Sequence, residues 1–155
     1  MKKIISLLIL IFTMPLLAGT AYQEGAKAYQ TEQYNLALKY FYISARNYNV
    51  NAYAKLGIIH DKGLGTGTNK LTALYWYQKA AQRHHPDAQY RLGHLYEMGE
   101  GTKKNMKKAT FWYQKAARNG NAKAKVRLSG KDPKKELPKD SNKSKGFFGK
   151  VSFWK

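Results

Sequence analysis

Apolar residues in the middle of the chain recur every three or four positions. The residues that share a face are Ala52, Leu56 and Ile59 in one stretch, and Ala73, Trp76, Tyr77 and Ala80 in the next. Residues at this spacing lie on one side of an α-helix, whereas a half-buried strand would alternate apolar and polar positions. The pattern predicts short amphipathic helices and an all-α fold class.

These helical patterns repeat along the sequence with a period of 36 residues. The matching positions are Leu56, Gly57, Ala73, Trp76, Tyr77 and Ala80 in one unit, and Leu92, Gly93, Ala109, Trp112, Tyr113 and Ala116 in the next. A fixed period of this length is typical of stacked repeats in which neighbouring units bury a continuous core. We therefore expect a repeat domain over residues 22–128, with about three helix pairs and a terminal partial helix.

Turn and capping residues fall between the expected helices. Glycine-rich stretches at 63–67 and 99–101 separate the two helices of a unit, and glycine readily ends a helix. Asn69 and Asn105 stand where the second helix needs an N-cap. Small residues such as Gly57 would let paired helices approach closely, and the tryptophans would fill the space between units.

The repeated pattern of Ala, Leu-Gly, Gly-x-Gly, Ala, Trp-Tyr and Lys-Ala-Ala resembles the Sel-like repeat, a relative of the tetratricopeptide repeat. The resemblance implies a right-handed α-solenoid of antiparallel helix pairs. It also implies protein–protein interaction, as an adaptor or as an exported bacterial protein in envelope assembly or host-cell contact, and it brings no shared catalytic residue. The chain departs from the pattern at His60, where a tyrosine is usual, and it lacks the cysteine pairs of one branch of the family.

Both ends of the chain differ from the repeats. Lys2 and Lys3 precede an apolar run over 4–17 that ends in small residues, which predicts a signal peptide over 1–21 and an exported protein, periplasmic or secreted. Residues 129–155 are rich in lysine, serine and proline, so we expect a disordered basic tail. This tail ends in an aromatic group formed by Phe147, Phe148, Phe153 and Trp154. Those side chains would either cover the open end of the solenoid or anchor the tail to a membrane or partner.

Charge is the second informative feature, because 28 basic residues stand against 9 acidic ones. A field of one sign attracts acidic partners and polyanions. We expect an acidic protein partner, with anionic lipid or a cell-wall polymer as other possibilities. Nucleic acid is not expected because no known binding module accompanies the charge.

A lysine cluster surrounds the expected cap Asn105. It consists of Lys103, Lys104, Lys107 and Lys108. Cations at a helix N-terminus oppose the helix dipole by about 0.3–1 kcal/mol each, so the sequence predicts that this cluster contacts an anion or an acidic partner.

A helical wheel also identifies positions on the first helix of each unit that point away from the Ala52/Leu56 face. These include Lys55 in one unit and Tyr90, Arg91 and His94 in the next. We interpret them as partner contacts on the extended surface that a solenoid offers. The alternative interpretation is that they are ordinary solvent-facing residues.

The sequence gives little indication of catalysis. It contains no cysteine and four histidines, and its glycine-rich loops repeat with the architecture. We therefore expect a monomeric, non-enzymatic scaffold without metal or cofactor. The alternative function is a cationic peripheral protein that binds anionic polymers or membranes.

Overall fold

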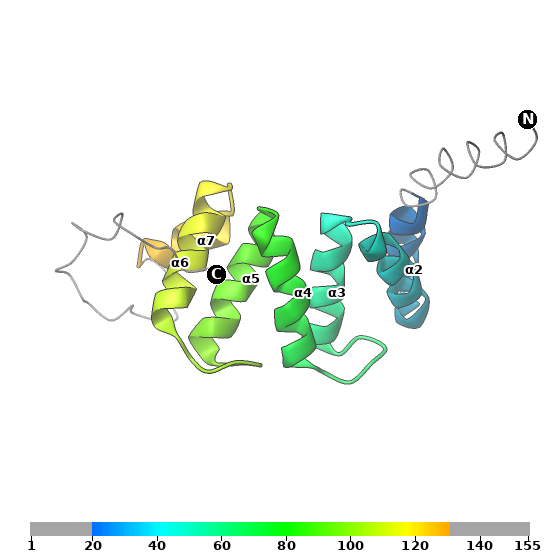
Figure 1. The fold of residues 1–155 in the computed structure, drawn as a ribbon, viewed down its shortest axis with the longest axis horizontal. Coiled ribbons are helices and arrows are strands. Elements are labelled where there is room, and N and C mark those ends of the chain that lie inside the picture. The colour runs from blue at the N-terminus through cyan, green and yellow to red at the C-terminus, as the bar shows by residue number, and fades with distance from the viewer. Residues whose placement is uncertain (1–19, 131–155) are drawn as a thin grey trace, which may run out of the picture.

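The computed structural model describes residues 20–130, which form a row of helices with no strand among them (Figure 1). After a helical segment at 20–30, the elements are α2 (Tyr34–Arg46), α3 (Val50–Lys62), α4 (Lys70–Gln82), α5 (Pro86–Met98), α6 (Met106–Arg118) and α7 (Ala122–Leu128). The all-α prediction is confirmed. Residues 1–19, most of the expected signal peptide, and the tail beyond residue 130 lie outside the described residues.

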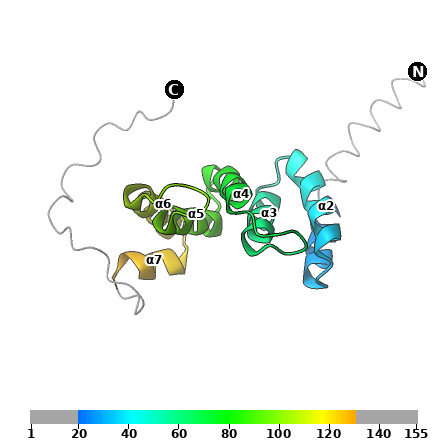
Figure 2. The same ribbon diagram turned by 90° about the horizontal axis from the view of Figure 1, so that it is seen from below.

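The helices pack as an α-solenoid. Each helix contacts its neighbour in sequence, and α3 also contacts α5. We call the segment 20–30, α3, α5 and α7 the first helices of their units, and α2, α4 and α6 the second helices. Figure 2, turned by 90°, shows the same succession of pairs. No helix within residues 20–130 is long and apolar enough to cross a membrane.

The predicted helix ends are confirmed. The side chains of Asn69 and Asn105 accept hydrogen bonds from the backbone N–H groups of Thr72 and Lys108, at 2.9 and 3.0 Å. Gly63 and Gly99 end α3 and α5 with φ angles of 71° and 77°, a conformation that other residues adopt only under strain. The capping chemistry therefore fixes the same helix lengths in both complete units.

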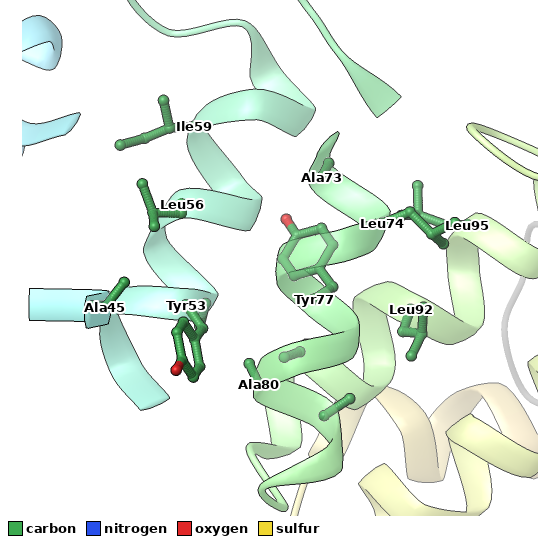
Figure 3. Close-up of a cluster of buried hydrophobic side chains, with 14 of the residues drawn as sticks. Ala45, Tyr53, Leu56, Ile59, Ala73, Leu74, Tyr77, Ala80, Leu92 and Leu95 are labelled. Carbon is green, nitrogen blue, oxygen red and sulfur yellow. The ribbon is translucent and has the colours of Figure 1, made fainter. Parts of the chain in front are cut away.

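The core is built around buried tyrosines. Tyr77 and Tyr113 are 1% and 2% exposed, and each ring lies against the glycine of the preceding first helix, Gly57 or Gly93. Figure 3 shows Tyr77 among the aliphatic side chains of α3, α4 and α5. The remaining predicted core residues, Leu56, Ala73, Ala80, Leu92, Ala109 and Ala116, are also buried.

The tryptophans, which we predicted to fill the space between units as core residues, are less central than expected. Trp76 and Trp112 are only partly buried and lie at the margin of the core. Trp76 does reach the preceding unit, where its ring meets Tyr42 at 5.7 Å between centroids. The neighbouring tyrosine occupies the centre because it faces a glycine, which leaves room for a ring between the helices.

The second glycine of each Gly-x-Gly loop joins one unit to the next. A Cβ atom at Gly101 would lie 2.4 Å from the backbone oxygen of Lys70, and one at Gly65 would lie 2.8 Å from Cβ of Tyr34. Lys70 and Tyr34 occupy the same repeat position at the start of a second helix. Each loop therefore packs on the start of the preceding second helix.

Candidate binding groove

A cavity of about 240 Å³ opens where the first helices of successive units meet. We call it the Arg91 cavity. Its principal lining residues are Tyr22 from the first helical segment, Lys55 from α3, Tyr77 from α4, Tyr90 and Arg91 from α5, and Lys123 from α7. The cavity therefore combines aromatic surface with three cationic side chains.

The structure brings together three of the four residues predicted as partner contacts. Lys55, Tyr90 and Arg91 line the cavity, but His94, almost one turn further along α5, does not. Two further lining residues, Tyr22 and Lys123, come from the incomplete terminal units and were not predicted from the sequence. Tyr22 precedes Ala54 by 32 residues, the offset between Gly25 and Gly57, so the repeat register contained a signal for it.

The electrostatic character of the cavity is cationic. The only carboxylate among the lining residues in the described part of the chain is Asp87, which accepts a 2.7 Å hydrogen bond from the Asn121 side-chain amide. Lys55 Nζ lies 4.8 Å from the centroid of the Tyr29 ring. His85 caps α5 through Nδ1, and burial lowers its pKa, which favours the neutral ring. The fixed positive charge thus comes from Lys55, Arg91 and Lys123.

A cluster around a buried carboxylate connects α5 to α7. Glu97 is 1% exposed, accepts a 2.8 Å hydrogen bond from the Tyr113 hydroxyl and forms an ion pair with Arg127. Burial and the adjacent Glu97 raise the pKa of Tyr113 far above its usual value, so its hydroxyl stays protonated and donates.

The corresponding cluster one unit earlier has a different cation. Lys70 Nζ lies 2.6 Å from Asp61 and 2.9 Å from Glu100. The Tyr77 hydroxyl donates to Asp61 at 3.3 Å. This cluster joins α3, α4 and the loop after α5, and it lies against the wall of the cavity that Tyr77 forms.

The predicted anion site is a separate surface. Lys103, Lys104, Lys107 and Lys108 are all exposed around the start of α6, whose first turn contains no acidic residue. Lys108 Nζ lies 5.1 Å from the centroid of the Tyr96 ring. None of the four lines the Arg91 cavity.

The described residues offer no metal centre. They include no group of three histidine, aspartate or glutamate side chains that could hold an ion. His94 and Glu97 lie three residues apart on α5, the spacing of a two-ligand metal site, but the Glu97 carboxylate is buried and already bonded to Tyr113 and Arg127. The aromatic anchors Phe147, Phe148, Phe153 and Trp154 lie outside the described residues.

Stacked helix pairs with a groove between their first helices define a tandem helix-pair repeat protein. The Sel1 repeat family matches residues 16–49, 50–85 and 86–121, and the chain belongs to this family. No curated protein sequence matches the chain. Sel1 repeat proteins generally act as protein-interaction scaffolds.

Three solved structures illustrate the likeness. A Sel1 repeat protein from Oxalobacter formigenes is 36% identical, with a TM-score of 0.67, and the match covers 69% of this chain and 44% of that one. A protective antigen present in uropathogenic Escherichia coli strains, c5321, is 25% identical, with a TM-score of 0.69 and coverage of 72% and 25%.

The third structure is cysteine rich protein B of Helicobacter pylori, which is 22% identical, with a TM-score of 0.58 and coverage of 72% and 94%. At that identity the likeness concerns the fold alone. This chain spans less than half the length of the first two proteins.

Proposed function

We propose that this protein is an interaction scaffold that binds an acidic segment of a partner protein in the Arg91 cavity. The observation that carries the proposal is the convergence of Lys55, Arg91 and Lys123 on one cavity that also has tyrosine walls. Aromatic rings provide contact area at small entropic cost, and the cations favour a partner of opposite charge. The family's general role in protein interaction supports the same proposal.

The charge of the whole repeat region supports an acidic partner. Residues 22–128 contain 18 basic and 6 acidic side chains. An excess of one sign speeds encounter with an oppositely charged surface and disfavours basic competitors. We further propose that the scaffold acts as a monomer and has no catalytic role.

We also propose that the protein is exported and acts in the bacterial envelope or in host-cell contact. The basis is the sequence of residues 1–21, with its lysines, apolar run and small residues. One similar protein is described as a protective antigen present in uropathogenic Escherichia coli strains, and we take this likeness as support for the host-contact part of the proposal.

The second candidate is a cationic peripheral protein that binds anionic polymers or membranes. The exposure of all four residues of the lysine cluster favours this alternative. Binding that depends on many exposed lysines weakens steeply as salt rises, whereas a complex with a packed aromatic centre weakens less.

Affinity capture from envelope and host-cell extracts tests the two candidates. The full chain is compared with a cavity variant, Lys55→Glu/Arg91→Glu, and a charge-matched cluster variant, Lys103→Glu/Lys107→Glu. The proposal predicts one discrete acidic protein that survives a high-salt wash and is lost only with the cavity variant. Capture of lipid or polysaccharide alone, eluted by salt and lost with the cluster variant, would support the alternative instead.

A further inference from the structure

The two carboxylate clusters, one around Asp61 and one around Glu97, occupy equivalent repeat positions. With the 36-residue offset, Asp61 corresponds to Glu97, Tyr77 to Tyr113 and Arg91 to Arg127, and Lys70 corresponds to Met106. The same offset relates Lys55 to Arg91, so a cation stands at this position in three successive first helices. The two junctions can therefore be compared residue by residue within one chain.

At the α5–α7 junction the cation at this repeat position is Arg127, which forms an ion pair with a carboxylate of the same chain. Arg127 pairs with Glu97, and Tyr113 donates to the second carboxylate oxygen. Met106 carries no charge, so it does not compete for the carboxylate. The position of Arg127 is thus suited to receive a carboxylate beside a buried tyrosine.

At the α3–α5 junction the same arrangement lacks the arginine–carboxylate pair. Asp61 is one methylene shorter than Glu97, and Lys70, in the place of Met106, holds it at 2.6 Å. Among residues 20–130, no carboxylate forms an ion pair with Arg91, whose partly buried side chain lines the cavity. Arg91 and Tyr77 line the same cavity, and burial and Asp61 raise the pKa of Tyr77 while the positive charge of Arg91 opposes that shift.

We propose that Arg91 receives a carboxylate of the partner, in the place where Arg127 receives Glu97 one unit later. This inference rests on the proposed function and names the group that the cavity recognises. A guanidinium forms paired hydrogen bonds with a carboxylate, and a partly buried setting strengthens them. The carboxylate comes either from an aspartate or glutamate side chain or from the C-terminus of a peptide.

The inference can be tested without a partner, by thermal unfolding of the full chain. Arg127→Met should lower the melting temperature by more than about 10 °C, whereas Arg91→Met should leave it nearly unchanged. Asp61→Glu/Lys70→Met copies the second junction into the first. In that background Arg91 acquires an internal carboxylate, and Arg91→Met should lower the melting temperature. A large loss from Arg91→Met in the wild-type chain would overturn the inference, because Arg91 would then already be paired.

Binding is tested with three sets of fluorescent decapeptides. Within a set the neutral flanking residues vary from peptide to peptide, and the same flanking sequences are used in all three sets. The first set has a central glutamate and an amidated C-terminus, the second a central glutamine and a free C-terminal carboxylate, and the third a central glutamine and an amide. We expect binding from the first or second set, about tenfold weaker binding from the third, and a similar loss with Arg91→Met or with Asp61→Glu/Lys70→Met. Arg46→Met, an exposed control, should bind as the wild type does.

The outcomes separate the inference from the proposed function. Peptides that lose affinity with Lys55→Glu but not with Arg91→Met would overturn the inference and leave the cavity as the binding site. Equal affinity for the third set would also overturn it. The absence of binding from all three sets would overturn both.

Discussion

The ring of Tyr77 lies against the backbone of Gly57, where a Cβ atom would come within 2.5 Å of the ring carbon Cδ1. The same relationship joins Gly93 to Tyr113, where the distance would be 2.8 Å. The glycine in each first helix therefore makes room for the tyrosine of the second helix. This close approach explains why the helix pair tolerates a residue that weakens a helix by about 1 kcal/mol relative to alanine.

Gly57→Ala should destabilise the protein by about 1–3 kcal/mol despite the better helix propensity of alanine, because the methyl group overpacks the ring. Urea unfolding followed by circular dichroism measures the change. The control is Gly67→Ala, since a Cβ at Gly67 would meet nothing within 4 Å. An equal or greater stability of Gly57→Ala would show that the ring moves aside at no cost.

Tyr77→Ala should cost about 3–5 kcal/mol because it removes a fully buried ring. Trp76→Ala should cost less, about 1–3 kcal/mol, because the indole is only partly buried. The two variants are compared in the same urea titration. A larger loss of stability from Trp76→Ala than from Tyr77→Ala would show that the tryptophan contributes more to the core than the tyrosine does.

The pair Glu97–Arg127 attaches the last helix to α5. Arg127→Met should cost about 3–5 kcal/mol, because it leaves a buried carboxylate without its cation. Lys125→Met, on the exposed face of the same helix, should have little effect. Adding Glu97→Leu to Arg127→Met should recover part of the loss, and a failure to recover would indicate that Arg127 contributes mainly by packing.

His60 should make the stability depend on pH. Its ring forms a 2.9 Å hydrogen bond with the Tyr42 hydroxyl, and burial lowers the pKa of His60 in the folded protein. The unfolded chain, with a histidine pKa of about 6.5, therefore binds this proton first, so stability falls as the pH drops below about 6.5 toward the folded-state pKa.

The equivalent pair one unit later is Gln78 and Tyr96, joined at 3.1 Å. Tyr42→Gln/His60→Tyr copies that pair and should reduce the loss of stability between pH 7 and pH 5, measured by urea unfolding at each pH. His85, whose pKa is also lowered by burial, should supply the remaining dependence. His84→Gln, at an exposed position, is the control, and an unchanged slope in the double variant would contradict the assignment to His60.

Much of the fold could be predicted because each repeat unit carries the same sequence signals, so one unit supports the interpretation of the next. The period of 36 residues, the caps at Asn69 and Asn105 and the glycine helix ends are all local signals, and the structure confirms them. The choice between Trp76 and Tyr77 for the core centre could not be made, because both fall on the apolar face and only the facing Gly57 decides between them.

The candidate site was predictable in part for a similar reason. The helical wheel placed Lys55, Tyr90 and Arg91 together, and the offset also marks Arg127 as equivalent to Arg91. The sequence does not show that Arg127 is paired inside the protein while Arg91 is not. That difference arises because Asp61 is one methylene shorter than Glu97 and because Lys70 forms an ion pair with Asp61. Only the packed structure reveals these contacts.

Mapping the binding surface on the full chain by NMR tests the central claim most directly. The ¹⁵N-labelled protein is titrated with the tightest carboxylate-bearing decapeptide, and backbone and arginine side-chain shifts are followed. We predict saturable shifts at Lys55, Tyr90 and Arg91, including the Arg91 Nε–H signal, with little change over residues 103–108. Shifts confined to the lysine cluster, with the Arg91 cavity unaffected, would contradict it.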